Sequence, residues 1–172
     1  MLTLRALTPA DNAPAANVIR TVMPEFGCVG EGYSINDPEL EDMYATYSAD
    51  RSAFFVLEQE VGGPAGAKVG TSGAVVVGVG GYAPLAGGDG TVCELRKMYL
   101  LPEARGFGGG RLILDACLAG ARADGFERMY LETVTAMTTA RAVYEKYGFE
   151  FLEWPLGATG HSGCDLFMVR DL

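Results

Sequence analysis

The chain has 172 residues, of which 49% are hydrophobic, and this is enough apolar material for the core of one domain. Its formal net charge of −9 makes it a poor partner for nucleic acid, because phosphates attract clustered lysine and arginine. No run of about 20 apolar residues, as a membrane span requires, is present, and the first residues lack the pattern of a signal peptide. We therefore expect one cytoplasmic domain over residues 1–172.

The first part of the chain predicts a strand and then two helices. Residues 2–7 alternate between apolar and polar side chains, as in a strand. Apolar residues at helical spacing follow between Asp11 and Pro24, and residues 25–39 read as a loop. A second helix is predicted to begin at the Asp-Pro-Glu of residues 37–39 and to end near residue 48. The apolar stripe of the first helix contains Ala15, Val18, Ile19 and Val22.

The middle of the chain predicts three strands, over residues 53–60, 74–85 and 91–101, of which the second is apolar and rich in β-branched side chains. Glycine-rich turns over residues 61–73 and 87–90 separate them. Strands joined directly by turns pair as antiparallel hairpins, so we expect this part of the sheet to be antiparallel.

The last part alternates helices and strands. Helices are predicted over residues 108–124 and 138–148, and strands over residues 128–134, 149–154 and 164–172. The apolar stripe of the first of these helices contains Leu112, Ile113, Ala116, Cys117 and Gly120, and that of the second contains Ala140, Val143, Tyr144 and Tyr147. The whole order predicts an α/β fold, with a central mixed and mostly antiparallel sheet of about six or seven strands and with helices on both faces.

Charge is spread unevenly along the chain. Residues 1–60 hold ten acidic and three basic side chains, whereas residues 61–172 hold twelve and ten. An acidic first third favours a cationic substrate if it borders the site. Solubility alone would explain the same imbalance equally well.

The cysteines and the histidine do not have the spacing of a metal site. The four cysteines, Cys28, Cys93, Cys117 and Cys164, form no C-x-x-C pair, and His161 is the only histidine. We interpret the cysteines as small buried thiols in a reducing compartment, and we predict no metal.

The segment LLPEARGFGGGRL, residues 100–112, places consecutive glycines where a helix is about to begin. Glycine costs a helix roughly 1 kcal/mol per residue relative to alanine, so the run indicates either a flexible turn or a close approach to an anion. The first turn of a helix offers free N–H groups to phosphate, and glycine removes the Cβ atoms in the way. A P-loop is excluded because no Lys-Ser or Lys-Thr follows, and a dinucleotide fingerprint is excluded because Arg111 stands where its last glycine belongs.

Arg105, Gly108 and Gly110 fit the pattern R-x-x-G-x-G, and here the sequence resembles the GNAT superfamily of N-acetyltransferases. In that family the segment forms the pyrophosphate-binding loop for acetyl-CoA. The stretches KMYLLPEARGFGGG and AVYEKYGF are similar to the family's strand and loop and to its tyrosine-bearing helix. These motifs cover about residues 92–150, and the predicted order of elements also matches the fold. The family often has asparagine seven residues before the helix tyrosine, where this chain has Met137.

The resemblance implies that acetyl-CoA is the co-substrate. The strand before the loop is expected to splay from its neighbour and to offer its main chain to the pantetheine arm, with a Leu100 N–H near the thioester oxygen. The residues implied to bind the cofactor are Met98, Tyr99, Leu100, Arg105, Gly106, Phe107, Gly108, Gly109, Gly110 and Arg111. Those implied to border the acceptor are Phe26 and Tyr33, after the first helix, and His161, in the last hairpin loop. For His161 a structural or surface role is the alternative.

Two side chains are candidates for proton transfer. Glu94 lies on the strand before the loop, where relatives carry a glutamate, and would accept a proton from an ammonium whose ordinary pKa is about 10.4. Its alternative role is an ion pair with Arg96, two residues on and on the same strand face. Tyr144 would protonate or hold the leaving sulfur. The apolar stripe alone favours a core aromatic at Tyr144, and the resemblance favours the role at the sulfur.

The resemblance therefore predicts an N-acetyltransferase that moves an acetyl group from acetyl-CoA to a primary amine by direct attack in a ternary complex. The acceptor would be a small molecule or a peptide, and the acidic first third favours a cationic one. A non-catalytic acyl-CoA sensor of the same fold is the alternative. Relatives often form homodimers, and the sequence leaves this open.

Overall fold

Residues 1–60 and 73–172, which the computed structural model describes, form a sheet of seven strands. The strands are β1 (Leu2–Ala6), β2 (Ala53–Glu60), β3 (Ala74–Pro84), β4 (Val92–Leu100), β5 (Arg128–Thr133), β6 (Glu150–Leu152) and β7 (Leu166–Asp171). Their order is β1-β2-β3-β4-β5-β7-β6, and neighbours are antiparallel except for β4 and β5, which are parallel. The mixed and mostly antiparallel sheet confirms the predicted fold class. The turn predicted over residues 61–73 lies outside the described residues except for Gly73.

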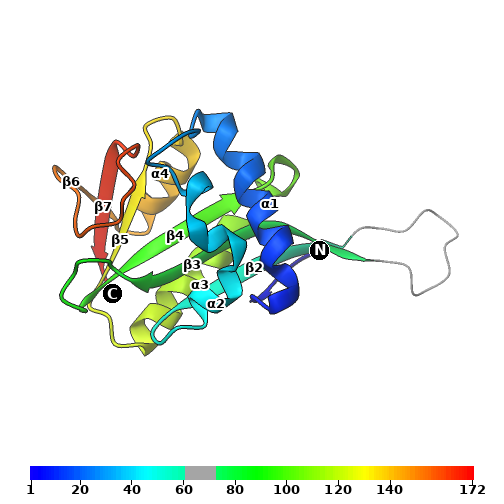
Figure 1. Cartoon of the computed structure of the whole chain (residues 1–172), viewed down its shortest axis with the longest axis horizontal. Helices are drawn as coiled ribbons and strands as arrows, with labels where there is room; N and C mark the ends of the chain where they lie inside the picture. Colours follow the sequence, from blue (N-terminus) through cyan, green and yellow to red (C-terminus); the bar gives the residue numbers. More distant parts are fainter. Residues whose placement is uncertain (61–72) are drawn as a thin grey trace, which may run out of the picture.

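Helices cover both faces of the sheet, as predicted (Figure 1). They are α1 (Asn12–Val22), α2 (Met43–Tyr47), α3 (Gly109–Ala123) and α4 (Thr138–Lys146). On one face α1 and α2 bury Ile19 and Met43 against strand residues such as Val56. On the other face α3 and α4 bury Ile113 and Tyr144 in a second core. The stripes predicted for α1 and α4 are the sides of those helices that face the sheet.

The single helix predicted over residues 37–48 is wrong. Ser34–Asn36 and Pro38–Glu41 form short 3₁₀ turns, and α2 begins only at Met43. Asp42 interrupts the helix because its φ of −149° and ψ of 75° are not helical. Its carboxylate accepts a hydrogen bond from the Ala45 N–H at 3.1 Å. The aspartate is thus the N-cap of a new helix and not part of a longer one.

The apolar stripe predicted for α3 is rotated from the observed one. Leu112, predicted to be buried, is 43% exposed. The buried residues of α3 are Gly109, Ile113, Leu114, Cys117, Leu118 and Ala121. A Cβ on Gly109 would lie 2.5 Å from Cδ2 of Leu57 on β2, so the helix approaches the sheet closely at this glycine. Close packing at Gly109 therefore sets the face that α3 turns toward the sheet.

The last two strands are shorter than predicted. β6 and β7 lie inside the predicted ranges 149–154 and 164–172 and leave a loop of residues 153–165 between them. This loop carries His161 to the centre of the sheet, where its ring lies near Glu94 on β4.

Candidate active site

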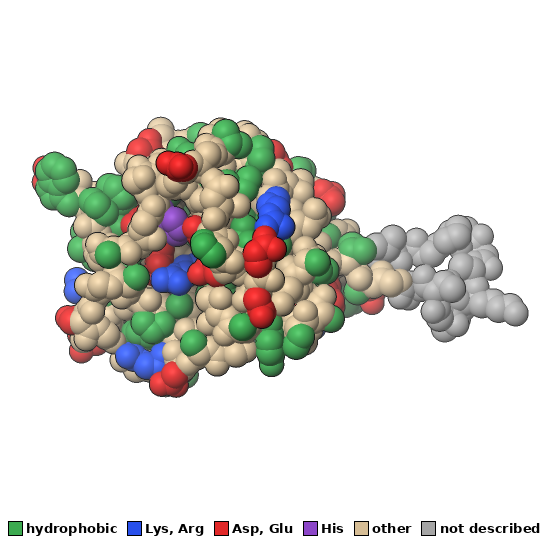
Figure 2. Space-filling view, viewed as in Figure 1, with side chains coloured by type: hydrophobic (Ala, Val, Ile, Leu, Met, Phe, Trp, Pro, Cys, Tyr) green, Lys and Arg blue, Asp and Glu red, His purple; other side chains and the backbone are tan. Residues whose placement is uncertain are grey.

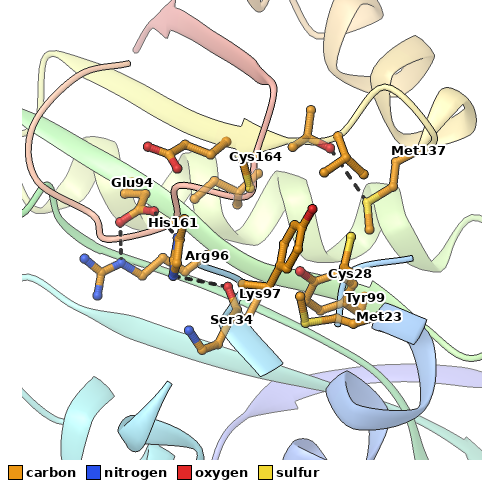
Figure 3. A pocket seen from close by; sticks show the side chains of 15 residues that line it. Met23, Cys28, Ser34, Glu94, Arg96, Lys97, Tyr99, Met137, His161 and Cys164 are labelled. Carbon is orange, nitrogen blue, oxygen red and sulfur yellow. Dashed lines mark hydrogen bonds and ion pairs between the residues drawn. The ribbon is translucent and has the colours of Figure 1, made fainter. Parts of the chain in front are cut away.

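The sheet divides at Glu94. The parallel pairing of β4 with β5 covers only Val92 to Glu94 of β4. Beyond this point β4 pairs only with β3 and β5 pairs only with β7, so the two halves of the sheet separate (Figure 1). Residues 95–100 of β4 therefore present a backbone edge that no described strand covers. A pocket lies at the fork and is lined from both strands, by Tyr99 of β4 and Thr133 of β5 among others (Figure 3).

A β-bulge follows the fork in β4. Lys97 and Met98 together lie opposite Gly80 of β3, so β4 has one residue more than its partner here. Lys97 has a φ of 52°, which is uncommon for a residue with a side chain and costs about 1–3 kcal/mol of strain. Its side chain is only 1% exposed, and its ammonium forms ion pairs with Asp37 and, at 2.6 Å, with Glu39. These ion pairs hold the bulge and join β4 to the 3₁₀ segment between α1 and α2.

Glu94 and Arg96 form a buried ion pair. Nε of Arg96 donates to Oε2 of Glu94 at 2.7 Å, and the two side chains are 16% and 3% exposed (Figure 3). The alternative role predicted for Glu94 is thus present. Burial raises the pKa of Glu94, and the nearby Arg96 charge opposes this rise without cancelling it. A carboxylate with a raised pKa is a better proton acceptor, so the ion pair is compatible with a role in proton transfer.

His161 faces Glu94 from the loop between β6 and β7. Its Nδ1 lies 3.8 Å from Oε1 of Glu94, while its Nε2 lies 3.1 Å from Oδ2 of Asp37 and 3.3 Å from Oγ of Ser34. The hydrogen bond with Asp37 raises the pKa of His161 above its ordinary value. Burial acts to raise the pKa of Asp37, but the His161 hydrogen bond and the Lys97 charge outweigh it and lower that pKa to about 2. Asp37 is therefore ionised at neutral pH.

Two loops meet over this side of the sheet. The Gly163 N–H donates to the Gly32 carbonyl at 3.0 Å, which joins the last hairpin loop to the loop after α1. A Cβ on Gly163 would lie 2.5 Å from the Tyr33 ring, so that ring rests directly on the opposite backbone. Tyr33 and His161, both predicted at the acceptor site, line the same pocket. In Figure 2 the histidine is recessed in the surface, with acidic and basic side chains around it.

The pocket beside His161 has a volume of about 210 Å³ and a strongly charged lining. Its lining residues are Asp37, Pro38, Glu39, Glu94, Arg96, Lys97, Thr159 and His161. Glu132 lines the adjoining pocket, where the Thr159 hydroxyl donates to its Oε1 at 2.9 Å. The carboxylates of the two pockets outnumber their permanent cations, Arg96 and Lys97. The pocket walls therefore carry an excess of negative charge, which favours a cationic ligand.

The glycines of the loop before α3 have different roles. Gly106 and Gly108 have φ values of 84° and 85°, and a Cβ at either would have nothing within 4 Å. Glycine is needed there for its backbone conformation, and the space beside the first turn of α3 stays open. Gly109 is needed for packing on the sheet, whereas a Cβ on Gly110 would make only an ordinary 3.4 Å contact with Met98. Of the two motif glycines, Gly108 is therefore needed for its backbone conformation. Gly110 is needed neither for its conformation nor for close packing.

Arg105 joins this loop to the end of the α1 region. Its Nε donates to the Leu100 carbonyl at 3.0 Å, and its Nη1 forms an ion pair with Glu25 at 2.8 Å. Its guanidinium also lies 5.8 Å from the centre of the Phe26 ring. Phe26, predicted at the acceptor, therefore packs beside the loop arginine. Phe107 is 73% exposed, and Arg111 is also exposed.

The glycine loop allows a matched test of binding against stability. The resemblance implies that this loop binds acetyl-CoA, and on that expectation Gly108→Ala should weaken the binding about tenfold, because an alanine there disfavours the left-handed turn before α3. Gly125→Ala is the control, since Gly125 has a φ of 77° and equally open surroundings at the other end of α3. Both variants should lose about 1–2 kcal/mol of stability. Isothermal titration calorimetry with acetyl-CoA distinguishes the two variants, since only Gly108→Ala should lose affinity. Equal affinities of the two variants for acetyl-CoA would exclude the loop as the phosphate site.

Tyr144 of α4 lies in the core. It is 6% exposed, and its ring packs edge-on against Phe149 with centres 5.7 Å apart, so the core role predicted as its alternative is present. Burial raises the pKa of Tyr144. Met137, where the family often has asparagine, lines the fork pocket, and its sulfur lies 3.7 Å from the Thr133 hydroxyl.

Four residues that line the pockets together with His161 were not predicted, namely Ser34, Asp37, Glu39 and Lys97. One signal was available, because a lysine within the apolar strand 91–101 is unusual and demands a charged partner. The partner could not be read from spacing, since Asp37 is 60 residues away from Lys97.

Residues 18–149 match the family model for the acetyltransferase (GNAT) family. The chain is 41% identical over 170 residues to the uncharacterized N-acetyltransferase YjgM of Escherichia coli K12. The aligned region covers 98% of this chain and 94% of that protein.

Solved structures show the same fold. An acetyltransferase of the GNAT family from Staphylococcus aureus matches with a TM-score of 0.79 at 17% identity, over 99% of both chains. A phosphinothricin acetyltransferase from Sinorhizobium meliloti, solved with acetyl-CoA, matches with a TM-score of 0.74 at 21% identity, over 99% of this chain and 88% of that one. At these identities the likeness concerns the fold alone.

Proposed function

The chain belongs to the acetyltransferase (GNAT) family, and we propose that it moves an acetyl group from acetyl-CoA to a primary amine bound beside Glu94. One observation carries the proposal. A buried carboxylate lies where the uncovered edge of β4 meets a pocket with an excess of negative charge. Acetyl donor and amine would then approach Glu94 from two sides, as direct attack in a ternary complex requires.

The donor side has the features that acetyl-CoA needs. The backbone of residues 98–100 lies on the uncovered edge of β4 and is available to the amide groups of a pantetheine arm. The open backbone at Gly106 and Gly108 precedes the N-terminus of α3, a 15-residue helix whose free N–H groups suit a pyrophosphate. Acetyl-CoA would supply the thioester at the fork. The acetyl-CoA in the Sinorhizobium relative of the same fold supports this assignment.

The acceptor side suits an ammonium. Asp37, Glu39 and Glu94 line the pocket, and a bound cation would offset the excess of negative charge. A volume of about 210 Å³ is smaller than the usual range for drug-sized ligands, roughly 300–1,000 Å³. We therefore propose a small cationic amine, or the amine-bearing end of a longer molecule such as a peptide.

Glu94 and Tyr144 would act on the protons. The Glu94 carboxylate accepts a proton from the bound ammonium, and the electron pair left on nitrogen forms the new C–N bond as the C–S bond breaks. The leaving thiolate has an ordinary pKa of about 8.5. Because burial raises the pKa of Tyr144, its phenol stays protonated and can hold the sulfur by a hydrogen bond.

Tyr144→Phe tests this role with little disturbance to the core. The ring and its contact with Phe149 remain, so the melting temperature should stay within about 2 °C of wild type. The variant is expected to lower kcat about 10- to 100-fold with little change in KM, because the hydroxyl acts on a charge that develops only as the bond breaks. Steady-state kinetics measures both constants, and an unchanged kcat would leave Tyr144 a core residue only.

The function itself is tested by release of free thiol. Wild-type protein and acetyl-CoA are mixed with a panel of amines, and the thiol is detected with DTNB. Release with a cationic amine, together with a mass gain of one acetyl group on that amine, is the expected result. Tight acetyl-CoA binding without release on any amine would contradict the proposal and indicate the non-catalytic sensor instead.

A further inference from the structure

We propose that His161, held by Asp37, is a second proton acceptor at this site and passes a proton from the reacting nitrogen to solvent. The inference rests on the proposed acetyl transfer to an amine. It concerns a step that Glu94 cannot complete alone.

The reaction removes two protons from the acceptor nitrogen. An ammonium must lose one N–H proton before its nitrogen can attack, and it loses another once the C–N bond has formed. The C–S bond breaks with its electron pair on sulfur, so one of the two protons ends on that sulfur. The other must reach solvent. Glu94 is 3% exposed and bound to Arg96, so it is less well placed than a more exposed group to release that proton.

His161 lies where the second proton would have to go. Its Nδ1 is 3.8 Å from Oε1 of Glu94, which places two proton acceptors on one side of the pocket within reach of one nitrogen. Both side chains line the pocket of about 210 Å³, but that of His161 is 14% exposed and that of Glu94 only 3%. The imidazole is therefore the more accessible of the two groups.

Asp37 determines which nitrogen of the ring is free. An ionised carboxylate can only accept a hydrogen bond, so Nε2, 3.1 Å from Asp37, carries the hydrogen. In the neutral ring Nδ1 is then unprotonated, and its lone pair faces Glu94 and the pocket. Lys97 in turn fixes Asp37 by an ion pair. Asp37 is thus a positioning residue that acts through His161.

The charges around the ring favour its protonated form. Asp37 and Glu94 raise the pKa of His161, while Lys97 lowers it and burial opposes the charge. Glu132 lies beyond and accepts a hydrogen bond from the Thr159 hydroxyl, whose oxygen accepts from the backbone N–H of His161 at 3.3 Å. His161 must be neutral to accept a proton, so activity should fall as pH drops through a midpoint above about 6.5.

Three variants test the proposal by the pH dependence of kcat/KM. His161→Gln is expected to lower kcat/KM about 100-fold at pH 7.5 and to abolish this acid limb, while acetyl-CoA affinity and melting temperature stay unchanged. Asp37→Asn is expected to move the midpoint to lower pH, because the ring loses the charge that stabilises its protonated form. Asp50→Asn, at an exposed aspartate that lines neither pocket, is the control and should keep the wild-type midpoint.

Chemical rescue separates proton transfer from a structural role. Adding imidazole should raise the kcat/KM of His161→Ala at least tenfold, since a free imidazole can occupy the vacated space and accept the proton. Absence of rescue, together with an unchanged acid limb in His161→Gln and Asp37→Asn, would overturn the proposal while leaving the acetyltransferase activity in place. A wild-type protein that releases no thiol with any amine would instead refute the proposed function, and this inference with it.

Discussion

Glu94→Gln is expected to lower kcat/KM by about 100- to 1,000-fold at pH 7, which is within the usual range for loss of a general base. Glutamine has nearly the same shape and keeps an oxygen that can accept from Arg96, so the change removes proton acceptance more than packing. The loss should be largest at low pH. It should shrink as pH rises toward about 10, where the free amine already predominates. Initial rates of thiol release across this pH range measure the effect.

The control for this prediction is Glu145→Gln on α4, at an exposed glutamate away from the fork. Its rates should match those of the wild-type protein at every pH. Acetyl-CoA affinity, measured by titration calorimetry, should be the same in both variants because Glu94 is not placed at the donor's phosphates. Wild-type rates in Glu94→Gln across the whole pH range would remove Glu94 from the mechanism.

The parts of this fold that depend on local pattern could be predicted from the sequence. The strand predicted over residues 53–60 is β2 itself, and the sheet-facing sides of α1 and α4 follow the 3.6-residue period. The ion pair of Glu94 with Arg96 follows from strand alternation alone. The errors arose where a single residue overrode the pattern. Asp42 starts a new helix, and Gly109 sets which face of α3 packs on the sheet.

The charged network around His161 could not be predicted in the same way. Asp37 and His161 are 124 residues apart, and no periodicity links them. Lys97 reaches Asp37 through a β-bulge, which shifts the strand's alternation at a position that the sequence does not mark with glycine. Tertiary contacts alone bring these residues together. The family resemblance therefore pointed to Glu94 and His161 separately, and no spacing rule could place them beside each other.

Lys97→Met is expected to lower the free energy of unfolding by about 3 kcal/mol, at the low end of the range for removal of one partner from a buried ion pair. Methionine fills a similar volume, so the loss comes from the carboxylates of Asp37 and Glu39, which the ammonium no longer neutralises. Asp37 keeps its contact with His161, and Glu39 keeps those with the Tyr47 hydroxyl and, at 3.9 Å, with Arg96, which limits the loss. For a chain of this length the melting temperature should fall by about 6–12 °C. Lys146→Met, at an exposed lysine on α4, is the control and should change little.

The pH dependence identifies the cause of that loss. The pKa of Asp37 is about 2 in the folded protein, below its ordinary value of about 3.9, so its contribution to stability is present above pH 4 and disappears as pH falls toward 2. The difference between wild type and Lys97→Met, measured by urea unfolding, should therefore be smaller at pH 3 than at pH 7. Adding Asp37→Asn and Glu39→Gln to Lys97→Met should recover part of the loss at pH 7, because no unpaired buried charge remains. The loss in free energy of unfolding could instead be the same at both pH values and in the triple variant. That result would assign the loss to the bulge conformation of residue 97 and not to the charge of Lys97.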